Sequence, residues 1–357
     1  MKVALVCFRM DTPLSRVSSY STELAAHLIN HGIDVVRLAS GSGGFSDVAY
    51  LRSTSDWNFT TKVSLRLRSF VQHEEVDLVH IIGGFPESGI LRSLHVPIVY
   101  QFFGGNFGVS TQKHSMFQKI RGVIARYRIS WLANRTIKSA DHLIVHSEDA
   151  IGFLIKKYSV NRSNISLVPI ATDDLTNQAN TNSTDDRRSV LVLCDYYSKD
   201  MVLQALRALN RLIIEDSGVR FRLLCDFASY FAVLRTIKDE GMDALVDCIE
   251  CRTVDDFQYE SSESECVVIP QILLSRERLI AETRVIGTQV IHFAPSSVQN
   301  IKDSLGAEHI VSTFDEIVDY VTSKPFLGKK VYERNPYSWD KAVVPIVEVY
   351  SELIGRG

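Results

Sequence analysis

The chain has 357 residues, more than one hydrophobic core usually supports, so we expect two domains of ordinary size. Its composition, 45% hydrophobic and 23% charged, is typical of a soluble globular protein, and no run approaches the roughly 18 apolar residues of a membrane span. A formal net charge of −3, with no recognisable nucleic-acid-binding module, argues against nucleic acid as a partner. The opening residues, MKVALVCFRM, predict a strand rather than a signal peptide.

Six cysteines lie scattered through apolar stretches, as free thiols of a reduced, cytoplasmic compartment do: Cys7, Cys194, Cys225, Cys248, Cys251 and Cys266. Cys248 and Cys251 form a CxxC, but no second CxxC or nearby histidine completes a zinc site. We therefore expect these two thiols to be buried and inert. The sequence also has no Asp-x-Asp, and we expect no metal.

Short β-branched runs alternate with segments of helical periodicity in the first half of the chain. Strands are predicted at 2–8, 33–40, 76–84, 96–103, 142–147 and 165–171, and helices at 21–32 and 147–158. Such alternation predicts a parallel sheet with both faces covered.

The alternation stops at 173–188, DDLTNQANTNSTDDRR, a polar segment without aromatic residues that predicts a linker. It then resumes, with strands predicted at 189–197, 219–227, 246–252, 265–271, 288–294 and 308–314, and helices at 199–218, 230–241, 255–264, 279–287, 316–324 and 338–355. We therefore expect two doubly wound α/β domains, at 1–172 and 189–337. The last segment, 338–357, is expected to be a helix that crosses back to the first domain.

Neither common nucleotide-binding loop is present. The residues after the first strand, RMDTPLSR, contain no glycine, so the GxGxxG of dinucleotide-binding proteins is missing, and no GxxxxGK occurs. GSGG at 41–44 is typical of a flexible turn. The expected site is therefore the cleft between the domains, at the carboxyl ends of the strands.

Residues 279–291, LIAETRVIGTQVI, combine a glutamate near the start of a short helix, a glycine that ends the helix, and a buried strand. The simplest interpretation of Glu282 is a solvated carboxylate favoured by the helix dipole. In its wider context, however, the chain resembles the retaining nucleotide-sugar glycosyltransferases of the GT-B type, in family four. The resemblance rests on an ordered set of motifs: SRVSSYSTELAAHLINHGIDVV, DLVHIIGG, VPIVYQFFGG, SADHLIVHSEDAIGFL, LVPIATD, Lys199 with Asp200, VVIP and AETRVIGTQVI.

The resemblance implies a donor site in the second domain. Glu282 would accept hydrogen bonds from the ribose hydroxyls of a nucleoside diphosphate sugar, and Lys199 would neutralise its diphosphate. The base would lie against Arg252 and Thr253, and the loop SRERL, with Ser275 and Arg276, would face the sugar. Ser15, Arg16, Phe103 and Gly104 would form the acceptor-side loops. No cofactor is implied beyond the nucleotide-sugar substrate.

Several positions depart from the family pattern. The family's first glutamate, its arginine, its Gly-Gly pair, its histidine and its Asn-Gly are replaced by Leu274, Cys194, Ser15 with Arg16, Phe103, and Ile170 with Ala171. Two alternatives stay open: an enzyme with rearranged contacts, or a catalytically silent GT-B protein that binds or stabilises an active glycosyltransferase partner.

Three arginines bear on this choice, because an arginine fork can replace a missing cation at a diphosphate. Arg16, Arg276 and Arg278 are candidates, although solvated surface arginines fit the sequence equally well. The histidines His80, His142 and His146 are assigned no proton-transfer role.

The first domain is basic. Residues 1–175 carry 19 basic against 14 acidic side chains, and 88–140 contain eight Lys or Arg and no acidic residue. Within this stretch, Phe117, Ile120, Ile124, Tyr127 and Trp131 recur at helical spacing beside the cations. An ordinary core face would explain this pattern. The alternative is a peripheral contact with the anionic, cytoplasmic face of a membrane, next to a lipid-linked or glycan acceptor.

Overall fold

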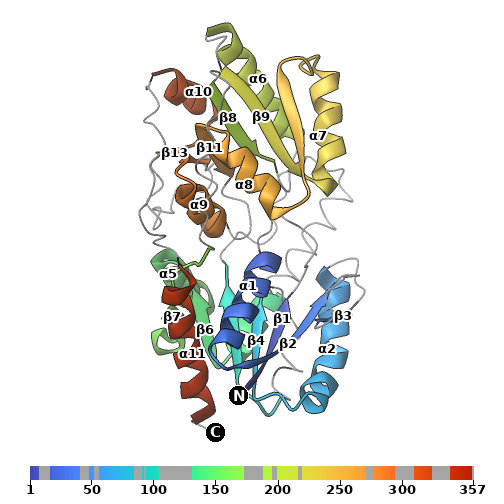
Figure 1. Cartoon of the computed structure of the whole chain (residues 1–357), viewed down its shortest axis with the longest axis vertical. Coiled ribbons are helices and arrows are strands. Elements are labelled where there is room, and N and C mark those ends of the chain that lie inside the picture. Colours follow the sequence, from blue (N-terminus) through green and yellow to red (C-terminus); the bar gives the residue numbers. More distant parts are fainter. Residues whose placement is uncertain are drawn as a thin grey trace.

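Two parallel sheets with flanking helices make up the fold (Figure 1). The first sheet has seven strands in the order β3-β2-β1-β4-β5-β6-β7, and the second has six in the order β10-β9-β8-β11-β12-β13. Each order reverses once, as in doubly wound sheets, which confirms the predicted fold class. The structure, a computed structural model, describes residues 1–7, 17–40, 48–51, 56–83, 91, 94–103, 131–172, 188–194, 199–215, 219–270, 276–293, 309–323 and 338–355.

The first sheet contains β1 (Lys2–Cys7), β2 (Asp34–Ser40), β3 (Val48–Leu51), β4 (Leu78–Ile82), β5 (Ile98–Phe102), β6 (His142–Val145) and β7 (Ile165–Leu167). Its helical segments are α1 (Val17–Asn30), α2 (Asp56–His73), residues 131–139, α5 (Glu148–Tyr158) and the short η2 (Arg162–Asn164). The sequence predicted neither β3 nor α2. In α2 the stretch VSLRLR alternates apolar and polar residues as a strand does, although Val63, Leu67 and Val71 are buried at helical spacing.

The second sheet contains β8 (Arg188–Leu193), β9 (Val219–Asp226), β10 (Val246–Cys251), β11 (Cys266–Pro270), β12 (Gln289–Phe293) and β13 (His309–Val311). Its helices are α6 (Lys199–Glu215), α7 (Phe227–Asp239), α8 (Val254–Ser262), α9 (Arg276–Val285) and α10 (Phe314–Ser323). All six strands were predicted, within a few residues at each end. The central strand β11 is buried along its whole length, as a strand with helices on both faces must be.

Gly287 ends α9 as the sequence predicted. Its φ of 87° lies in the left-handed region, which glycine adopts without the steric penalty of a side chain. The Thr288 N–H donates to the Thr283 carbonyl (3.1 Å) and the Gly287 N–H to the Arg284 carbonyl (2.8 Å), the pair of bonds of a Schellman motif. The chain is thereby turned directly into β12.

The C-terminal helix α11 (Trp339–Gly355) packs on the first domain and contacts α1, as predicted (Figure 1). Its buried side chains join a core cluster with β1, β4, β5 and α1. The same cluster includes Ala281 of α9, so one helix of the second domain also enters this core.

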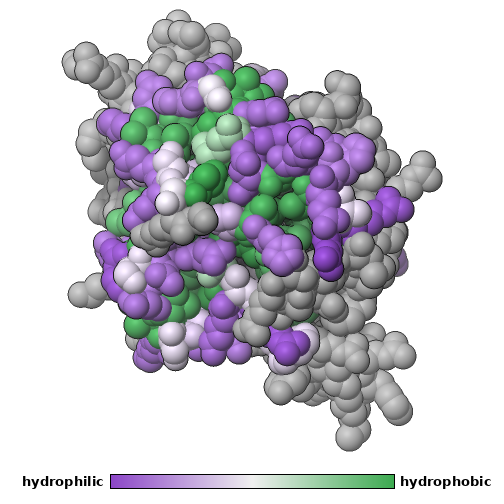
Figure 2. Space-filling model, turned by 90° about the horizontal axis from the view of Figure 1, so that it is seen from below, coloured by the Kyte–Doolittle hydropathy of each residue, from purple (hydrophilic) through white to green (hydrophobic). Residues whose placement is uncertain are grey.

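The lower end of the molecule, formed by the first domain, is chemically mixed. In Figure 2 the coloured apolar and polar residues alternate over this face. Among the described helices, none combines the length and apolar character needed to cross a bilayer.

Some predictions lie outside the described residues. Among them are residues 173–187 of the predicted linker (173–188) and residues 104–130 of the basic segment (88–140). The domain boundaries therefore stay predictions, although Arg188 already begins β8. Of the CxxC pair, Cys251 is buried, but Cys248 is partly exposed, so the expectation of burial is wrong for that thiol. Its sulfur lies 4.0 Å from that of Cys225 on the neighbouring strand β9.

Candidate functional site

The helices that carry the two main predicted donor residues follow neighbouring strands. Lys199 is the first residue of α6, which follows β8, and Glu282 lies on α9, which follows β11. β8 and β11 are hydrogen-bonded neighbours at the point where the strand order reverses. Ligands bind at this point in doubly wound sheets because the helix N-termini there diverge and leave a crevice.

Other predicted site residues lie outside the described part of the chain. Ser15, Arg16, Gly104 and Ser275 are among them. Arg276 begins α9 and Lys199 begins α6, but neither side chain is described.

Arg252 and Thr253 lie at the end of β10, on the outer edge of the second sheet. Thr253 is the N-cap of α8: its hydroxyl accepts from the Asp256 N–H, and the Asp256 carboxylate accepts from the Thr253 N–H in return. The Arg252 side chain is 74% exposed and pairs with Glu250 (2.7 Å). Thr253 therefore caps α8 and Arg252 forms a local ion pair, roles that the sequence analysis did not predict. The spacing T-x-x-D is typical of an N-terminal capping box.

Glu282 is buried rather than open to solvent. It is 1% exposed, and its Oε1 accepts a hydrogen bond from Arg278 Nε (2.8 Å) one turn earlier on α9. Arg278 is also 1% exposed. The interpretation of Glu282 as a solvated helix-start carboxylate is therefore wrong, and so is that of Arg278 as a surface arginine.

Arg278 reaches across to the first domain. Its Nη2 group donates to Glu23 of α1, and its guanidinium lies 5.6 Å from the centre of the Tyr20 ring. The second oxygen of Glu23 accepts from the Trp339 indole N–H (3.0 Å) at the start of α11. Three helices thus meet in one charged network, in which Glu23 alone of the four residues is partly exposed. It is called the Arg278 network below: Glu23, Arg278, Glu282 and Trp339.

Burial and the neighbouring carboxylates shift the pKa of Arg278 in opposite directions. Burial lowers the pKa of its guanidinium, but Glu282 and Glu23 raise it by more, so the net pKa lies above the ordinary value. A buried ion pair is stable only when such charged hydrogen bonds replace the lost water. Arg278 is therefore a permanent cation here, held between two carboxylates.

Aromatic rings and a histidine pack next to the Arg278 network. The Tyr20 ring contacts the rings of Trp339, Phe103 and His146, with centroids 4.9, 5.2 and 5.9 Å away. Phe103, predicted to face an acceptor, is 7% exposed and belongs to the core of the first domain. The acceptor surface is therefore not formed by this ring in the present arrangement.

His146 and His80 are both neutral. His146 Nδ1 contacts the Val168 carbonyl (2.9 Å), so it carries the proton, and Nε2 accepts from the Gln101 amide (2.9 Å). Burial lowers the pKa of His146 to about 4 and that of His80 to about 3. His80 is hydrogen-bonded to the Tyr350 hydroxyl of α11.

Sequence comparison finds a similarity in the first half of the chain. Residues 17–174, less than half of the chain, match the model of Glycosyltransferase Family 4. Over these residues the chain is similar to that family. No curated protein sequence matches the chain.

Solved structures with the same fold cover the whole chain. Sucrose-phosphate synthase from Thermosynechococcus elongatus superposes with a TM-score of 0.71 at 12% identity, covering 100% of both chains. A UDP-GlcNAc 2-epimerase from Neisseria meningitidis bound to UDP-GlcNAc gives 0.66 at 13%, covering 99% of this chain and 100% of its own. A lipopolysaccharide outer core galactosyltransferase gives 0.58 at 11%, covering 99% and 100%. At these identities the likeness shows the GT-B fold alone, which both transferases and an epimerase share.

Proposed function

We propose that this protein is a retaining glycosyltransferase of family 4 that moves a sugar from a nucleoside diphosphate sugar to an acceptor hydroxyl. The supporting observation is that Lys199 and Glu282 lie on helices that follow neighbouring strands, at the strand-order reversal of the second sheet. In this reaction the diphosphate leaves with its charge, and a cation at the start of α6 would stabilise it. The N-terminus of that helix adds its own attraction for an anion.

Glu282 would receive the ribose hydroxyls. A carboxylate offers about four acceptor positions, so the bond from Arg278 does not exhaust it. Because Glu282 is 1% exposed, a ribose reaches it only when the side chains that cover it shift. Ser275, Arg276, Arg252 and Thr253 remain further proposed donor contacts, and Ser15, Arg16 and Gly104 proposed acceptor-side residues.

The acceptor is proposed to be lipid-linked or a glycan. On the helix at 131–139, Leu132, Ala133 and Ile137 are buried, whereas Trp131 is 43% exposed and Arg135 lies 4.3 Å from the centre of its ring. An exposed tryptophan beside cations suits the interface of an anionic bilayer. This favours a peripheral contact of the first domain over the interpretation of Trp131 as a core residue.

The first test is a thermal-shift screen against UDP-, GDP- and ADP-sugars, followed by calorimetry. A donor at a hundred times its Kd stabilises the folded state by about 2.7 kcal/mol and raises the melting temperature. Glu282→Gln and Lys199→Ala should each weaken binding tenfold or more, since a charged hydrogen bond contributes about 1.5–3 kcal/mol. Unchanged affinity in both variants would refute the site.

A silent GT-B protein is the second candidate, and the buried state of Glu282 is the observation that favours it. Such a protein would bind none of the nucleotide sugars and would instead stabilise an active glycosyltransferase. Absence of any melting shift in the donor screen, together with tight binding to a transferase, would establish this alternative.

A further inference from the structure

The contact between α9 and the first domain has an apolar and a charged part. Ala281 packs in the same cluster as Tyr20 and Trp339, and Arg278 lies one turn earlier on the helix. Figure 1 shows α9 on the side of the second domain that faces the first. The helix that carries the proposed ribose carboxylate is therefore also a helix that joins the domains.

Two carboxylates hold the guanidinium. Nε donates to Glu282 and Nη2 to Glu23, while Nη1 is buried and has no hydrogen-bond partner among the residues that the structure describes. An arginine fork fixes both partners in direction as well as in distance, so Glu282 is oriented by a group that is itself anchored on the other domain.

The contact between α9 and α1 depends on the charges of both Arg278 and Glu23. One guanidinium lies between the buried carboxylate of Glu282 and the partly buried carboxylate of Glu23, so without Arg278 two like charges would face each other across the domain contact. Like charges in a buried site repel each other, and the repulsion is relieved when the groups separate or one of them is protonated. Without the Glu23 charge, in contrast, Arg278 and Glu282 still form a pair within α9, and only the tie to α1 is lost.

We propose that Arg278 is a positioning residue that ties the nucleotide-site carboxylate Glu282 to the first domain through Glu23. Nucleotide binding and docking of the two domains then depend on each other, and by linkage each affects the other by the same factor. The coupling to nucleotide binding rests on the proposed function, whereas the tie between Arg278 and Glu23 does not.

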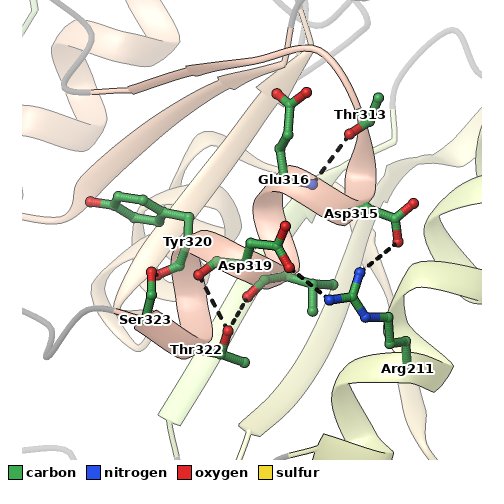
Figure 3. Close-up of polar contacts among 9 residues, drawn as sticks. Arg211, Thr313, Asp315, Glu316, Asp319, Tyr320, Thr322 and Ser323 are labelled. Atoms are coloured by element: carbon green, nitrogen blue, oxygen red, sulfur yellow. Dashed lines mark hydrogen bonds and ion pairs between the residues drawn. The ribbon is translucent and has the colours of Figure 1, made fainter.

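The experiment compares Glu23→Gln, Arg278→Gln and the double variant with a matched control. The control is Arg211→Gln, which removes an ion pair between α6 and α10 inside the second domain (Figure 3). Arg211 pairs with Asp319 (2.7 Å) and Asp315 (3.4 Å), and its side chain is 44% exposed. Circular dichroism verifies the fold of each variant, and Glu23→Gln preserves the shape of the side chain.

Hydrogen–deuterium exchange is measured first, without ligand. We expect amides of α1 and α9 to exchange at least tenfold faster in Glu23→Gln and Arg278→Gln, and at the wild-type rate in Arg211→Gln. If Arg278→Gln leaves α1 and α9 at the wild-type rate, the tie does not exist, whatever the protein binds.

Calorimetry with UDP, GDP and ADP gives the second readout. We expect Glu23→Gln to bind the preferred nucleotide at least fivefold more weakly, and the double variant to bind no more weakly than Arg278→Gln alone. We also expect this nucleotide to slow exchange in α1 of the wild type but not of Glu23→Gln, a difference that a purely structural role would not produce. Faster exchange with unchanged affinity overturns the coupling. A wild type that binds none of the three nucleotides overturns the proposed function and the coupling together, while the exchange rates still decide the tie.

Discussion

At the scale of single residues, the least expected feature is the set of buried polar side chains under the Arg278 network. His80, Gln101 and His146 come from the adjacent strands β4 and β5 and the end of β6, and all are at least nine-tenths buried. The fold keeps both imidazoles neutral, since a buried charge without a partner is costly. This makes the stability of the first domain sensitive to acid.

The first prediction concerns this pH dependence. The folded pKa values of His80 and His146, about 3 and about 4, lie below the unfolded value of 6.5. Between these limits the unfolded chain binds more protons, so the free energy of unfolding falls as the pH falls from about 6.5, by about 1.4 kcal/mol per pH unit for each histidine.

Urea denaturation from pH 7.5 to 4.5 measures this slope. We expect His146→Gln to remove its share of the slope and the exposed His31→Gln to leave it unchanged. An equal slope in wild type and His146→Gln would contradict a neutral, buried His146.

At the scale of secondary structure elements, α8 shows how a local signal assigns a residue a structural role. Thr253 and Asp256 form a complete capping box. Burial raises the pKa of the Asp256 carboxyl, but the hydrogen bonds it accepts from the Arg252 and Thr253 N–H groups outweigh this and hold it below the usual range. The loop that the resemblance placed near a nucleotide base is therefore tied to the start of α8 by these hydrogen bonds.

The second prediction tests this cap. Thr253→Ala should lower the free energy of unfolding by about 1 kcal/mol, because the N–H of Asp256 loses its acceptor. Thr253→Ser keeps the hydroxyl and should lose far less. Equal losses in both variants would mean that the methyl group, not the cap, stabilises α8.

The third prediction concerns α11, whose neighbouring positions differ sharply in burial. Ile346 is 0% exposed and Val344 is 44% exposed. Ile346→Ala should lower the free energy of unfolding by roughly 2–5 kcal/mol through the cavity it leaves. Val344→Ala should change it by less than about 0.5 kcal/mol. Guanidinium denaturation of both variants measures the difference, and similar values would contradict the docking of α11 on the first domain.

At the scale of the whole molecule, charge is divided unevenly between the two halves. Residues 1–175 have a net charge of +5, and the remainder has −8. Such a field would orient the molecule at an anionic surface with the first domain towards it. The proposed peripheral contact follows from this asymmetry together with the exposed Trp131.

The fourth prediction is binding to anionic vesicles. Phosphatidylserine-containing vesicles should sediment with the protein at low salt and release it at high salt, because each nearby cation contributes about 1 kcal/mol that salt screens. Replacing Lys119, Arg121, Arg126 and Arg128 with glutamine should abolish sedimentation. Binding to neutral vesicles, or binding that survives these replacements, would contradict the electrostatic contact.

The sequence by itself determined most of the described elements and their order. Hydrophobic periodicity gave the six strands of the second sheet, Gly287 marked the end of α9, and the final amphipathic helix was visible despite Pro345. These features are local, since a strand face or a helix end is set by residues within a few positions of one another. The sequence did not predict α2, because the apolar residues of VSLRLR fit the two-residue period of a strand as well as the helical period.

Only the tertiary structure decided which groups surround Glu282. Arg278, four residues before it, was within reach of a sequence argument, because positions i and i+4 share a helix face. Glu23, which holds the same guanidinium, is 255 residues away, and Tyr350 is 270 residues from the histidine it contacts. No local pattern encodes such pairs: they exist because two doubly wound sheets and a returning helix bring distant faces together, and burial then forces each polar group to find its partner there.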